Sequence, residues 1–432
     1  CRIQVLQHGS GDQRGDEETC SSLLRHHMSR EIITGIFNDS FPPIMDGVAI
    51  VTRNYAYWLN RIAGPSCVVT EEVPGYYDQE EFPVYRFPSL PLYARPPYRL
   101  GVSITGLVRQ KRIRGSNLKE VLQTQLFDVP FDIVHTHSPF SSGFLALRVA
   151  RMRKIPLVAS FHTKYKEDFL RVVENDFLAT VAVRQLVNFY NKADLVLVPS
   201  EETIETLRDY GYEGPVEVMA NGTDLVVDEK DLPALREQGA QAFAVPHSVP
   251  LILYIGQHIK EKNLDLVIDS LALLKKKGIP FRMLFIGDGY HAPALRQRAG
   301  EAGIGDLVTF KGIVRDRTLI TQAYARADLL FFPSLYDTSS LIIREAAGMR
   351  VPSLLVRGSS TAAGVIDGIN GFLAENDPSS MAASLELALG NEALRKQAGM
   401  GAYRTLYRTW EQVAHEVAAR YRILIEEYAS RF

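Results

Sequence analysis

The sequence predicts an α/β protein with two doubly wound domains, each a parallel sheet covered by helices on both faces. Short, continuously apolar and β-branched runs alternate with helix-length segments along almost the whole chain, as buried parallel strands do. These runs form two series, and the polar segment 224–249 between them is expected to be a linker with a short helix. The length of 432 residues is enough for two such domains.

The expected strands of the first domain are Ile32–Phe37, Cys67–Thr70, Val84–Phe87, Asp132–Thr136, Pro156–Phe161, Asp194–Pro199 and Val216–Met219. Those of the second domain are Leu251–Gly256, Phe281–Gly287, Leu307–Lys311, Asp328–Pro333 and Pro352–Val356. A helix is expected at Ala49–Leu59, and the apolar spacing of Trp410–Tyr428 predicts a last helix without a strand of its own. These elements place the two domains at residues 28–235 and 245–409. Residues 1–27 show no sustained period and are expected to be a disordered tail or upstream sequence.

Composition excludes several classes of protein. Lys and Arg number 48 and Asp and Glu 50, a net charge of −2 that argues against a nucleic-acid partner. Hydrophobic residues at 46% and charged residues at 23% argue against wholesale disorder. Three cysteines are too few for a disulfide framework, so we expect a reducing, cytoplasmic compartment. The apolar runs are far shorter than the roughly 20 residues of a membrane span.

Candidate ligand-binding residues follow the strands, because ligands of open parallel sheets bind beyond the carboxyl ends of the strands. Gly47 stands at the start of the helix after the first strand, where a phosphate or sugar could approach free backbone N–H groups. His137 and His162 follow two further strands of the same domain and are expected to face one crevice. The alternatives are a plain tight turn and two structural histidines.

Three strand ends of the second domain carry candidate residues. Gly256 ends a strand and is followed by Lys260 and Lys262, a combination of N–H groups and point charges that suits a diphosphate. Asp337 follows another strand, and Glu345 is expected two turns into the next helix. A carboxylate there can accept hydrogen bonds from two vicinal ribose hydroxyls. The alternative is a capping Asp with a solvated helix Glu.

Taken together, these motifs resemble the retaining glycosyltransferases of glycosyltransferase family 4, which have the GT-B fold of two Rossmann-like domains facing a central cleft. The resemblance covers about residues 30–428 and is strongest at Phe332–Gly348, with its two acids separated by seven residues. The supporting motifs, in order, are the Pro-Pro…Gly-Val loop at 42–48, Phe161-His162-Thr163, Val198-Pro199-Ser200, Asn221-Gly222-Thr223-Asp224 and Gly287-Asp288-Gly289. The resemblance implies a nucleotide-sugar donor on the second domain, an acceptor mainly on the first, and a C-terminal helix, residues 410–432, that crosses back to the first domain.

The resemblance also implies roles for single residues. Glu345 would hold the donor ribose, Lys262 the diphosphate and His162 an outer hydroxyl of the sugar. The candidate catalytic residues are His162, Lys262, Asp337 and Glu345, and the candidate donor-binding residues are Gly47, Gln257, Lys260, Gly287, Thr338, Ser339, Ser340, Leu341 and Glu345. The family works without a metal or other cofactor, since the departing phosphate is thought to help deprotonate the acceptor on the same face.

Two residues depart from the family pattern. Asp337 stands where the family usually has Glu, and Gln257 stands where it usually has an Arg on the diphosphate. His258 and Lys260 are nearby candidates to compensate for the missing charge. A nucleotide-sugar binding protein without turnover is therefore an alternative to an enzyme.

Two features point to a lipid acceptor. The segments His135–Phe140 and Phe161–Asp168 look like the diacylglycerol glucosyltransferase branch, whose donor is UDP-glucose. Between Leu92 and Glu120 the chain carries cations interleaved with apolar residues and no acid: Arg95, Arg99, Arg109, Lys111, Arg112, Arg114 and Lys119. We expect this segment to bind an anionic membrane surface at the inner face of the cell membrane; the alternative is a solvated helix face.

The predicted function is therefore retaining transfer of a hexose, expected to be glucose, from a UDP-sugar to a membrane lipid such as diacylglycerol. The alternatives within the fold are a soluble, cell-wall or protein acceptor, and a UDP-sugar epimerase.

Overall fold

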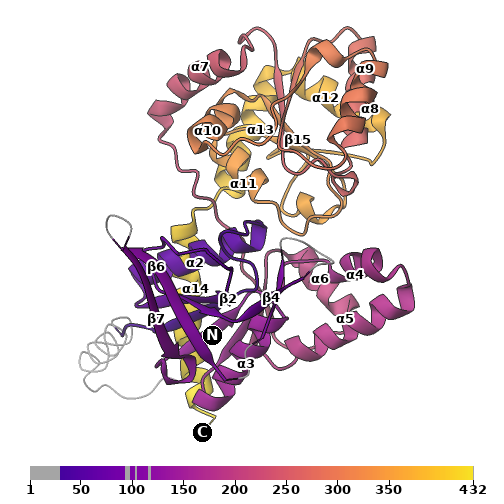
Figure 1. Ribbon diagram of the computed structural model, residues 1–432. Coiled ribbons are helices and arrows are strands. Elements are labelled where there is room, and N and C mark those ends of the chain that lie inside the picture. Colours follow the sequence, from indigo (N-terminus) through magenta and orange to yellow (C-terminus); the bar gives the residue numbers. More distant parts are fainter. Residues whose placement is uncertain (1–29, 93–97, 103–104, 115–117, 432) are drawn as a thin grey trace, which may run out of the picture.

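The computed structural model describes residues 30–92, 98–102, 105–114 and 118–431, which form two α/β lobes, one above the other in Figure 1. The expected tail at 1–27 lies outside the described residues. In the same view α11 (Leu341–Gly348), at the lower rim of the second domain, faces α2 (Gly47–Ile62) of the first domain. The facing of these two helices positions the site described below.

The first domain is built on a nine-stranded sheet in the order β11-β10-β9-β8-β1-β2-β3-β6-β7. Its strands are β1 Thr34–Phe37, β2 Ser66–Glu71, β3 Val84–Phe87, β6 Leu107–Arg114, β7 Leu118–Gln125, β8 Ile133–Thr136, β9 Leu157–Ser160, β10 Leu195–Val198 and β11 Val216–Val218. All pairs are parallel except β3–β6 and β6–β7. Every expected strand of this domain is present, and the central strands β1, β2, β8, β9 and β10 are fully buried runs. The edge strand β11 is only partly buried.

Helices cover both faces of this sheet. They are α2, α3 Ser141–Arg153, α4 Tyr165–Val173, α5 Asp176–Tyr190 and α6 Glu201–Asp209, with the short 3₁₀ turn η1 Leu126–Asp128. One core holds residues of α2 and of the C-terminal helix α14 (Trp410–Ala429), and another holds residues of α3 and α5.

The basic segment between Leu92 and Glu120 was expected to bind a membrane surface, with a solvated helix face as the alternative. In its described residues it forms antiparallel strands and no helix. β6 and β7 form a hairpin at the sheet edge, and β4 (Ser89–Pro91) pairs with β5 (Arg99–Gly101) as a separate two-stranded ribbon. Charged residues that alternate along an edge strand suit such a position, because they discourage pairing with other chains. In β6, Val108 is fully buried while its neighbour Arg109 is exposed.

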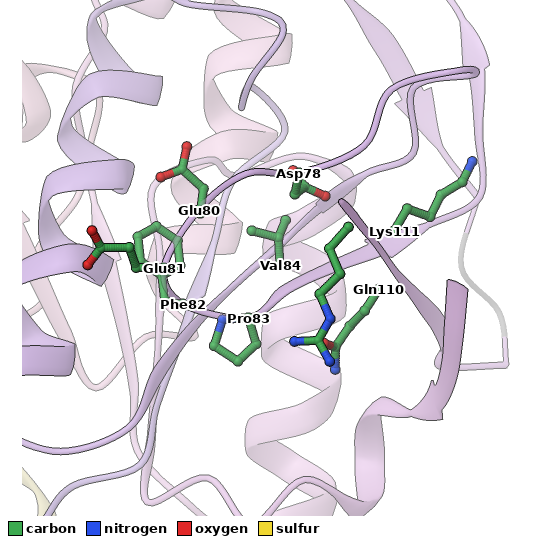
Figure 2. Close-up of a pocket in the computed structure, with 9 residues that line it drawn as sticks. Asp78, Glu80, Glu81, Phe82, Pro83, Val84, Gln110 and Lys111 are labelled. Carbon is green, nitrogen blue, oxygen red and sulfur yellow. The ribbon is translucent and has the colours of Figure 1, made fainter. Parts of the chain in front are cut away.

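A small cavity of about 130 Å³ lies between β6 and the loop that precedes β3 (Figure 2). Asp78, Glu80 and Glu81 of the loop line it together with Lys111 of β6. Beneath it, the buried Arg86 forms an ion pair with Asp78 at 2.7 Å. The basic hairpin therefore lies beside acidic side chains.

The second domain has a six-stranded, wholly parallel sheet in the order β14-β13-β12-β15-β16-β17. Its strands are β12 Leu251–Ile255, β13 Arg282–Ile286, β14 Val308–Phe310, β15 Leu329–Phe332, β16 Ser353–Val356 and β17 Phe372–Ala374. Its helices are α7 Leu232–Phe243, α8 Leu264–Lys276, α9 Ala292–Glu301, α10 Arg317–Arg326, α11, α12 Pro378–Gly390 and α13 Glu392–Thr405. Four 3₁₀ turns are η2 Glu229–Asp231, η3 Lys260–Lys262, η4 Gly305–Leu307 and η5 Ser360–Ala362. The five expected strands are present, and the short β17 at the edge is additional.

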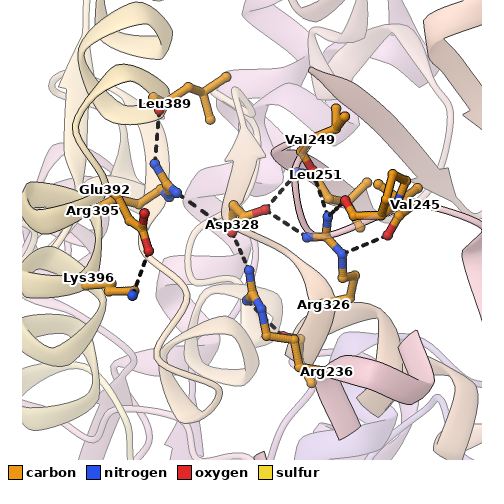
Figure 3. Close-up of polar contacts among 12 residues, drawn as sticks. Arg236, Val245, Val249, Leu251, Arg326, Asp328, Leu389, Glu392, Arg395 and Lys396 are labelled. Atoms are coloured by element: carbon orange, nitrogen blue, oxygen red, sulfur yellow. Dashed lines mark hydrogen bonds and ion pairs between the residues drawn. The ribbon is translucent and has the colours of Figure 1, made fainter. Parts of the chain in front are cut away.

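Asp328, just before β15, interacts with arginines from three helices of this domain (Figure 3). Arg236 of α7 and Arg326 of α10 donate to its carboxylate at 2.6 and 2.8 Å, and Arg395 of α13 lies 3.9 Å away. Burial alone would raise the pKa of Asp328, but the charge of Arg236 and the hydrogen bonds outweigh it and hold the pKa below its ordinary value. The helix expected in the linker, α7, therefore packs within the second domain.

The chain crosses between the domains twice, and the two crossings lie side by side. Thr223 on the way out bonds to Arg408 and Trp410 on the way back, with its N–H 2.8 Å from the Arg408 carbonyl oxygen. A Cβ on Gly222 would lie 2.7 Å from the Trp410 nitrogen, so the close approach requires glycine there. From Trp410, α14 runs back along α2, which confirms the expected return of the last helix to the first domain.

Candidate functional site

A cavity of about 640 Å³ opens between the two domains. The first domain contributes the start of α2, and the second contributes α11 and the loops before α10 and α11. Its polar lining includes Arg53, Asn54, Arg315, Arg317, Asp337 and Glu345, and its apolar lining includes Met45, Ile50, Leu341 and Trp410. A cavity of this size and mixed character suits a small organic ligand with several polar groups.

Glu345 is held at the cavity wall by two donors. Arg317 donates to one carboxylate oxygen at 2.6 Å, and the Tyr324 hydroxyl donates to the other at 2.6 Å. Arg317 also bonds Asp224 at 2.5 Å. Burial, followed by the nearby Glu345 charge, raises the pKa of Tyr324 well above its ordinary value, so its hydroxyl remains a donor. The carboxylate is therefore oriented and retains lone pairs for a ligand diol.

The position of Glu345 on its helix differs from the expectation. The loop Thr338–Ser340 delays the start of α11 to Leu341, so Glu345 lies about one turn into the helix rather than two. Ser339 and Ser340 line the cavity beside Leu341 and Asp337.

Asp337 and Lys262 form a chelated ion pair. The Lys262 ammonium lies 2.5 and 2.6 Å from the two carboxylate oxygens of Asp337. The side chains are 11% and 23% exposed, respectively, so the pair is largely withdrawn from water. Asp337 lines the cavity, which places the Lys262 charge directly behind it.

Gly47 opens α2 at the cavity. Asp46 caps the helix by accepting from the Ala49 N–H at 2.8 Å. A Cβ on Gly47 would meet no atom within 4 Å, so the space over the helix N-terminus is open to a ligand. A helix N-terminus favours negative charge, as in phosphate sites.

His162 lies between the domains but does not line the cavity. Its carbonyl oxygen accepts from the Thr338 hydroxyl of the second domain at 2.5 Å. Its ring lies in a stack with His137 and His135, where the His162 Nε2 is 2.9 Å from the His137 Nδ1. Burial lowers the pKa of His162 to about 4 and that of His135 to about 3, so these rings are neutral near pH 7.

The remaining candidate residues lie outside the cavity. Gln257 and Lys260 are exposed. Gly287 has a φ of +125°, and a Cβ there would lie 1.9 Å from the Gly256 carbonyl oxygen. Position 287 therefore requires glycine, because the carboxyl ends of β12 and β13 approach each other closely there.

His258 cannot supply the charge that Gln257 lacks. Its ring is fully buried against Phe285 and Phe310, and burial lowers its pKa. The expectation that His258 compensates as a cation is therefore wrong, and Lys260 is left as the candidate.

Sequence reasoning missed Arg317, Tyr324, Arg315 and Arg53. Arg317 and Tyr324 come from α10, whose pattern is that of an ordinary amphipathic helix. The sequence did hold one indication. Arg317 and Tyr324 are seven residues apart, a spacing that places two helical residues on the same face, two turns apart. The Asp224 that bonds Arg317 does belong to a motif noted in the sequence.

In the described ranges, no three His, Cys, Asp or Glu side chains gather as a metal site would require. None of the helices described is long and apolar enough to cross a bilayer.

Comparisons with known proteins agree with this geometry. Residues 45–227 match the family model described as Glycosyltransferase Family 4, and residues 236–405 match Glycosyl transferases group 1. The alpha-monoglucosyldiacylglycerol synthase of Streptococcus pneumoniae is 26% identical over 74% of this chain and 69% of its own length. That of Acholeplasma laidlawii is 23% identical over 78% of this chain and 83% of its own.

Solved structures share the fold over about nine tenths of the chain. Anabaena HepE in complex with UDP and glucose aligns with a TM-score of 0.66 at 16% identity, covering 90% of this chain and 99% of that one. Sucrose-phosphate synthase from Thermosynechococcus elongatus aligns with a TM-score of 0.68 at 17% identity, covering 92% and 100%. Family, fold and cavity agree: the chain belongs to glycosyltransferase family 4 and is a hexosyltransferase with the GT-B fold.

Proposed function

We propose that the protein transfers glucose from UDP-glucose to a membrane lipid such as diacylglycerol, with retention of the anomeric configuration. The proposal of a nucleotide-sugar donor rests on the oriented Glu345 carboxylate, which lies in an interdomain cavity of about 640 Å³. A ribose diol can donate two hydrogen bonds to such a carboxylate. HepE, a structural neighbour, is described in complex with UDP and with glucose.

The diphosphate would lie between Lys262 and the start of α2. An ammonium has three N–H donors, and Lys262 directs two toward Asp337, which leaves one for a phosphate oxygen. The open space over Gly47 lets the backbone N–H groups of α2 approach the same anion. The sugar would then rest against Ser339, Ser340 and Leu341, with Asp337 beside it.

Transfer in this arrangement needs no protein nucleophile. The bond between the sugar C1 and the phosphate oxygen breaks as the acceptor oxygen bonds to C1 on the same face. The acceptor proton passes to the departing phosphate oxygen. Lys262 and the α2 N-terminus stabilise the charge that develops on the diphosphate, which is the main contribution of the protein to the rate.

Support for a lipid acceptor comes from the relatives. Two alpha-monoglucosyldiacylglycerol synthases cover about three quarters of this chain. Other relatives at similar identity are D-inositol 3-phosphate glycosyltransferases and a GDP-mannose-dependent alpha-mannosyltransferase, so a soluble acceptor is the second candidate. A lipid acceptor also implies peripheral attachment to a membrane at the inner face of the cell.

Mass spectrometry of products tests the proposal. The protein is incubated with UDP-glucose, UDP-galactose, UDP-N-acetylglucosamine or GDP-mannose and with diacylglycerol dispersed in detergent. We expect hexosyl-diacylglycerol from UDP-glucose, and much less of it from the Glu345→Gln variant when UDP-glucose is subsaturating. If hexose is transferred only to soluble acceptors, the acceptor is a soluble molecule and the proposed lipid acceptor is wrong. If UDP binds but no product forms with any donor, the result would support the alternative that the protein binds nucleotide sugars without turnover.

A further inference from the structure

Several exposed apolar side chains of the first domain lie on the β4–β5 ribbon and the adjoining end of α3. The most exposed of them are Leu90 at 60%, Phe144 at 55% and Leu100 at 52%. Leu92, Val102 and Phe140 are between 37% and 43% exposed. Apolar side chains gathered at one place on a surface mark an interaction site more often than single ones do.

Strand geometry places the ribbon leucines on one face. Leu90 pairs directly with Leu100 across the ribbon, and Leu92 and Val102 follow at the two-residue period. The opposite face carries Ser89 and Arg99, which bond each other and the body of the domain. The apolar face of the ribbon therefore points outward.

The ribbon continues into α3. The Gly101 N–H, between Leu100 and Val102, donates to the Ser141 hydroxyl at 3.1 Å. Ser141 is the first residue of α3 and follows Phe140, so β4–β5 and the start of α3 form one surface. Phe144, Arg148 and Arg151 then lie along one exposed face of α3, at helical spacing.

The charge of this surface is positive. The sequence has no Asp or Glu between Glu81 and Glu120, nor between Asp132 and Glu167, and these two stretches contain the ribbon and α3. The acids that lie underneath are not exposed: Asp39 is half-buried and Glu71 is buried. Burial, followed by the nearby Asp39 charge, raises the pKa of Glu71 to about 9, which leaves it neutral near pH 7.

The surface also borders the cavity. The Tyr98 hydroxyl, beside β5, donates to Asp46 at 3.1 Å. Asp46 lies between Met45 and Gly47, which both line the cavity, and Met45 is 52% exposed. A headgroup presented at the ribbon would thus be near the bound donor.

The basic β6–β7 hairpin is a weaker candidate. Lys111 and Arg109 lie 2.7 and 3.4 Å from Glu72, and Arg112 lies 2.9 Å from Glu120. The carboxylates beside the hairpin offset its positive charge, so the hairpin as a whole is attracted less to an anionic surface. The side chain of Arg114 lies outside the described part of the chain.

We propose that the β4–β5 ribbon and the exposed face of α3 form the surface by which the protein docks on an anionic lipid bilayer. The leucines and phenylalanines enter the interface, and Arg148 and Arg151 lie at the headgroup level. The inference rests on the proposed lipid acceptor.

Flotation with vesicles of equimolar phosphatidylcholine and phosphatidylglycerol tests it. The variant Leu90→Ser/Leu100→Ser/Phe144→Ser should bind these vesicles about tenfold more weakly or worse. Arg148→Gln/Arg151→Gln should weaken binding and reduce its salt dependence. The control Leu387→Ser, at an equally exposed position of α12, should bind as the parent protein does.

The outcomes separate docking from catalysis. The triple variant should lose glucosyl transfer to diacylglycerol in vesicles and retain transfer to diacylglycerol dispersed in detergent. Vesicle binding equal to that of the parent, or weaker binding only in Arg109→Ser/Lys111→Ser/Arg112→Ser, would overturn the assignment of this surface. A dimer in sedimentation that dissociates in the triple variant would overturn it in favour of a second copy of the chain. Absence of transfer in detergent by the parent protein would instead count against the proposed function.

Discussion

The ammonium of Lys262 lies 2.5 and 2.6 Å from the two carboxylate oxygens of Asp337, across 75 residues of sequence. The pair joins the loop after β12 to the loop after β15 at the cavity wall. The pair fixes the position of the Lys262 ammonium. In the proposed donor arrangement, the role of Asp337 would therefore include holding this charge beside the departing diphosphate.

The first prediction concerns Asp337. Asp337→Asn should lower kcat about 100-fold, because it removes the acid beside the sugar and frees Lys262 to move. Asp337→Glu, which restores the usual acid of the family, should retain most of the activity. Steady-state kinetics with UDP-glucose checks both. Equal loss of activity in both variants would indicate that the site tolerates only the geometry of Asp.

The second prediction concerns Glu345. Glu345→Gln should weaken UDP binding about 30-fold, or about 2 kcal/mol, because an ionised acceptor for two hydroxyls is lost. Calorimetry measures the affinity, with Glu301→Gln on the exposed face of α9 as the matched control. Unchanged affinity in Glu345→Gln would remove its assignment to the ribose.

The third prediction concerns Gln257. Gln257→Arg should tighten UDP binding or raise kcat, since the guanidinium offers a phosphate fork that an amide lacks. The control Gln297→Arg adds the same charge on α9, away from the cavity. An equal gain in both variants would point to general electrostatic attraction.

The fourth prediction concerns the stacked histidines. Because burial lowers the pKa of His162 from 6.5 to about 4, the unfolded state binds more protons in this interval. Stability should therefore be full above pH 6.5 and fall as the pH drops from 6.5 toward 4. His137, whose pKa is also lowered well below its ordinary value, adds to the same loss.

Thermal unfolding between about pH 7 and about pH 5 measures this loss. His137→Gln should flatten the dependence of Tm on pH, whereas His415→Gln, at an exposed position of α14, should leave it unchanged. A slope that is the same in all three proteins would show that the stacked rings do not control acid stability.

The fifth prediction concerns metal. In the proposed arrangement Lys262 and the α2 N-terminus would stabilise the leaving diphosphate without a metal, so transfer should continue in EDTA. Loss of activity with chelator that Mn²⁺ or Mg²⁺ restores would contradict this account of the leaving group.

Sequence patterns predicted the buried parts of the fold well. Leu251–Ile255 and the other central strands are continuous apolar runs, so their position follows from burial alone. The β4–β5 ribbon and the β6–β7 hairpin were missed because edge strands carry polar and charged residues whose partners lie elsewhere in the chain.

The site was predictable only in its outline. Gly47 of the first domain lines one cavity with Asp337 and Glu345 of the second. Each follows the carboxyl end of a strand of its own sheet, which is where ligands of parallel sheets bind. The pairing of Lys262 with Asp337 and the support of Glu345 by Arg317 depend on tertiary contacts that no local pattern encodes. The burial of His258 was missed for the same reason.

The most direct test of the central claim is the product formed from UDP-glucose and diacylglycerol dispersed in detergent. Mass spectrometry and NMR of the purified product read the mass and the anomeric configuration together. We predict monoglucosyl-diacylglycerol with the α configuration of the donor, and a much lower yield with Glu345→Gln at subsaturating UDP-glucose. A β-linked product, or glucose transferred only to water or a soluble acceptor, would contradict the account.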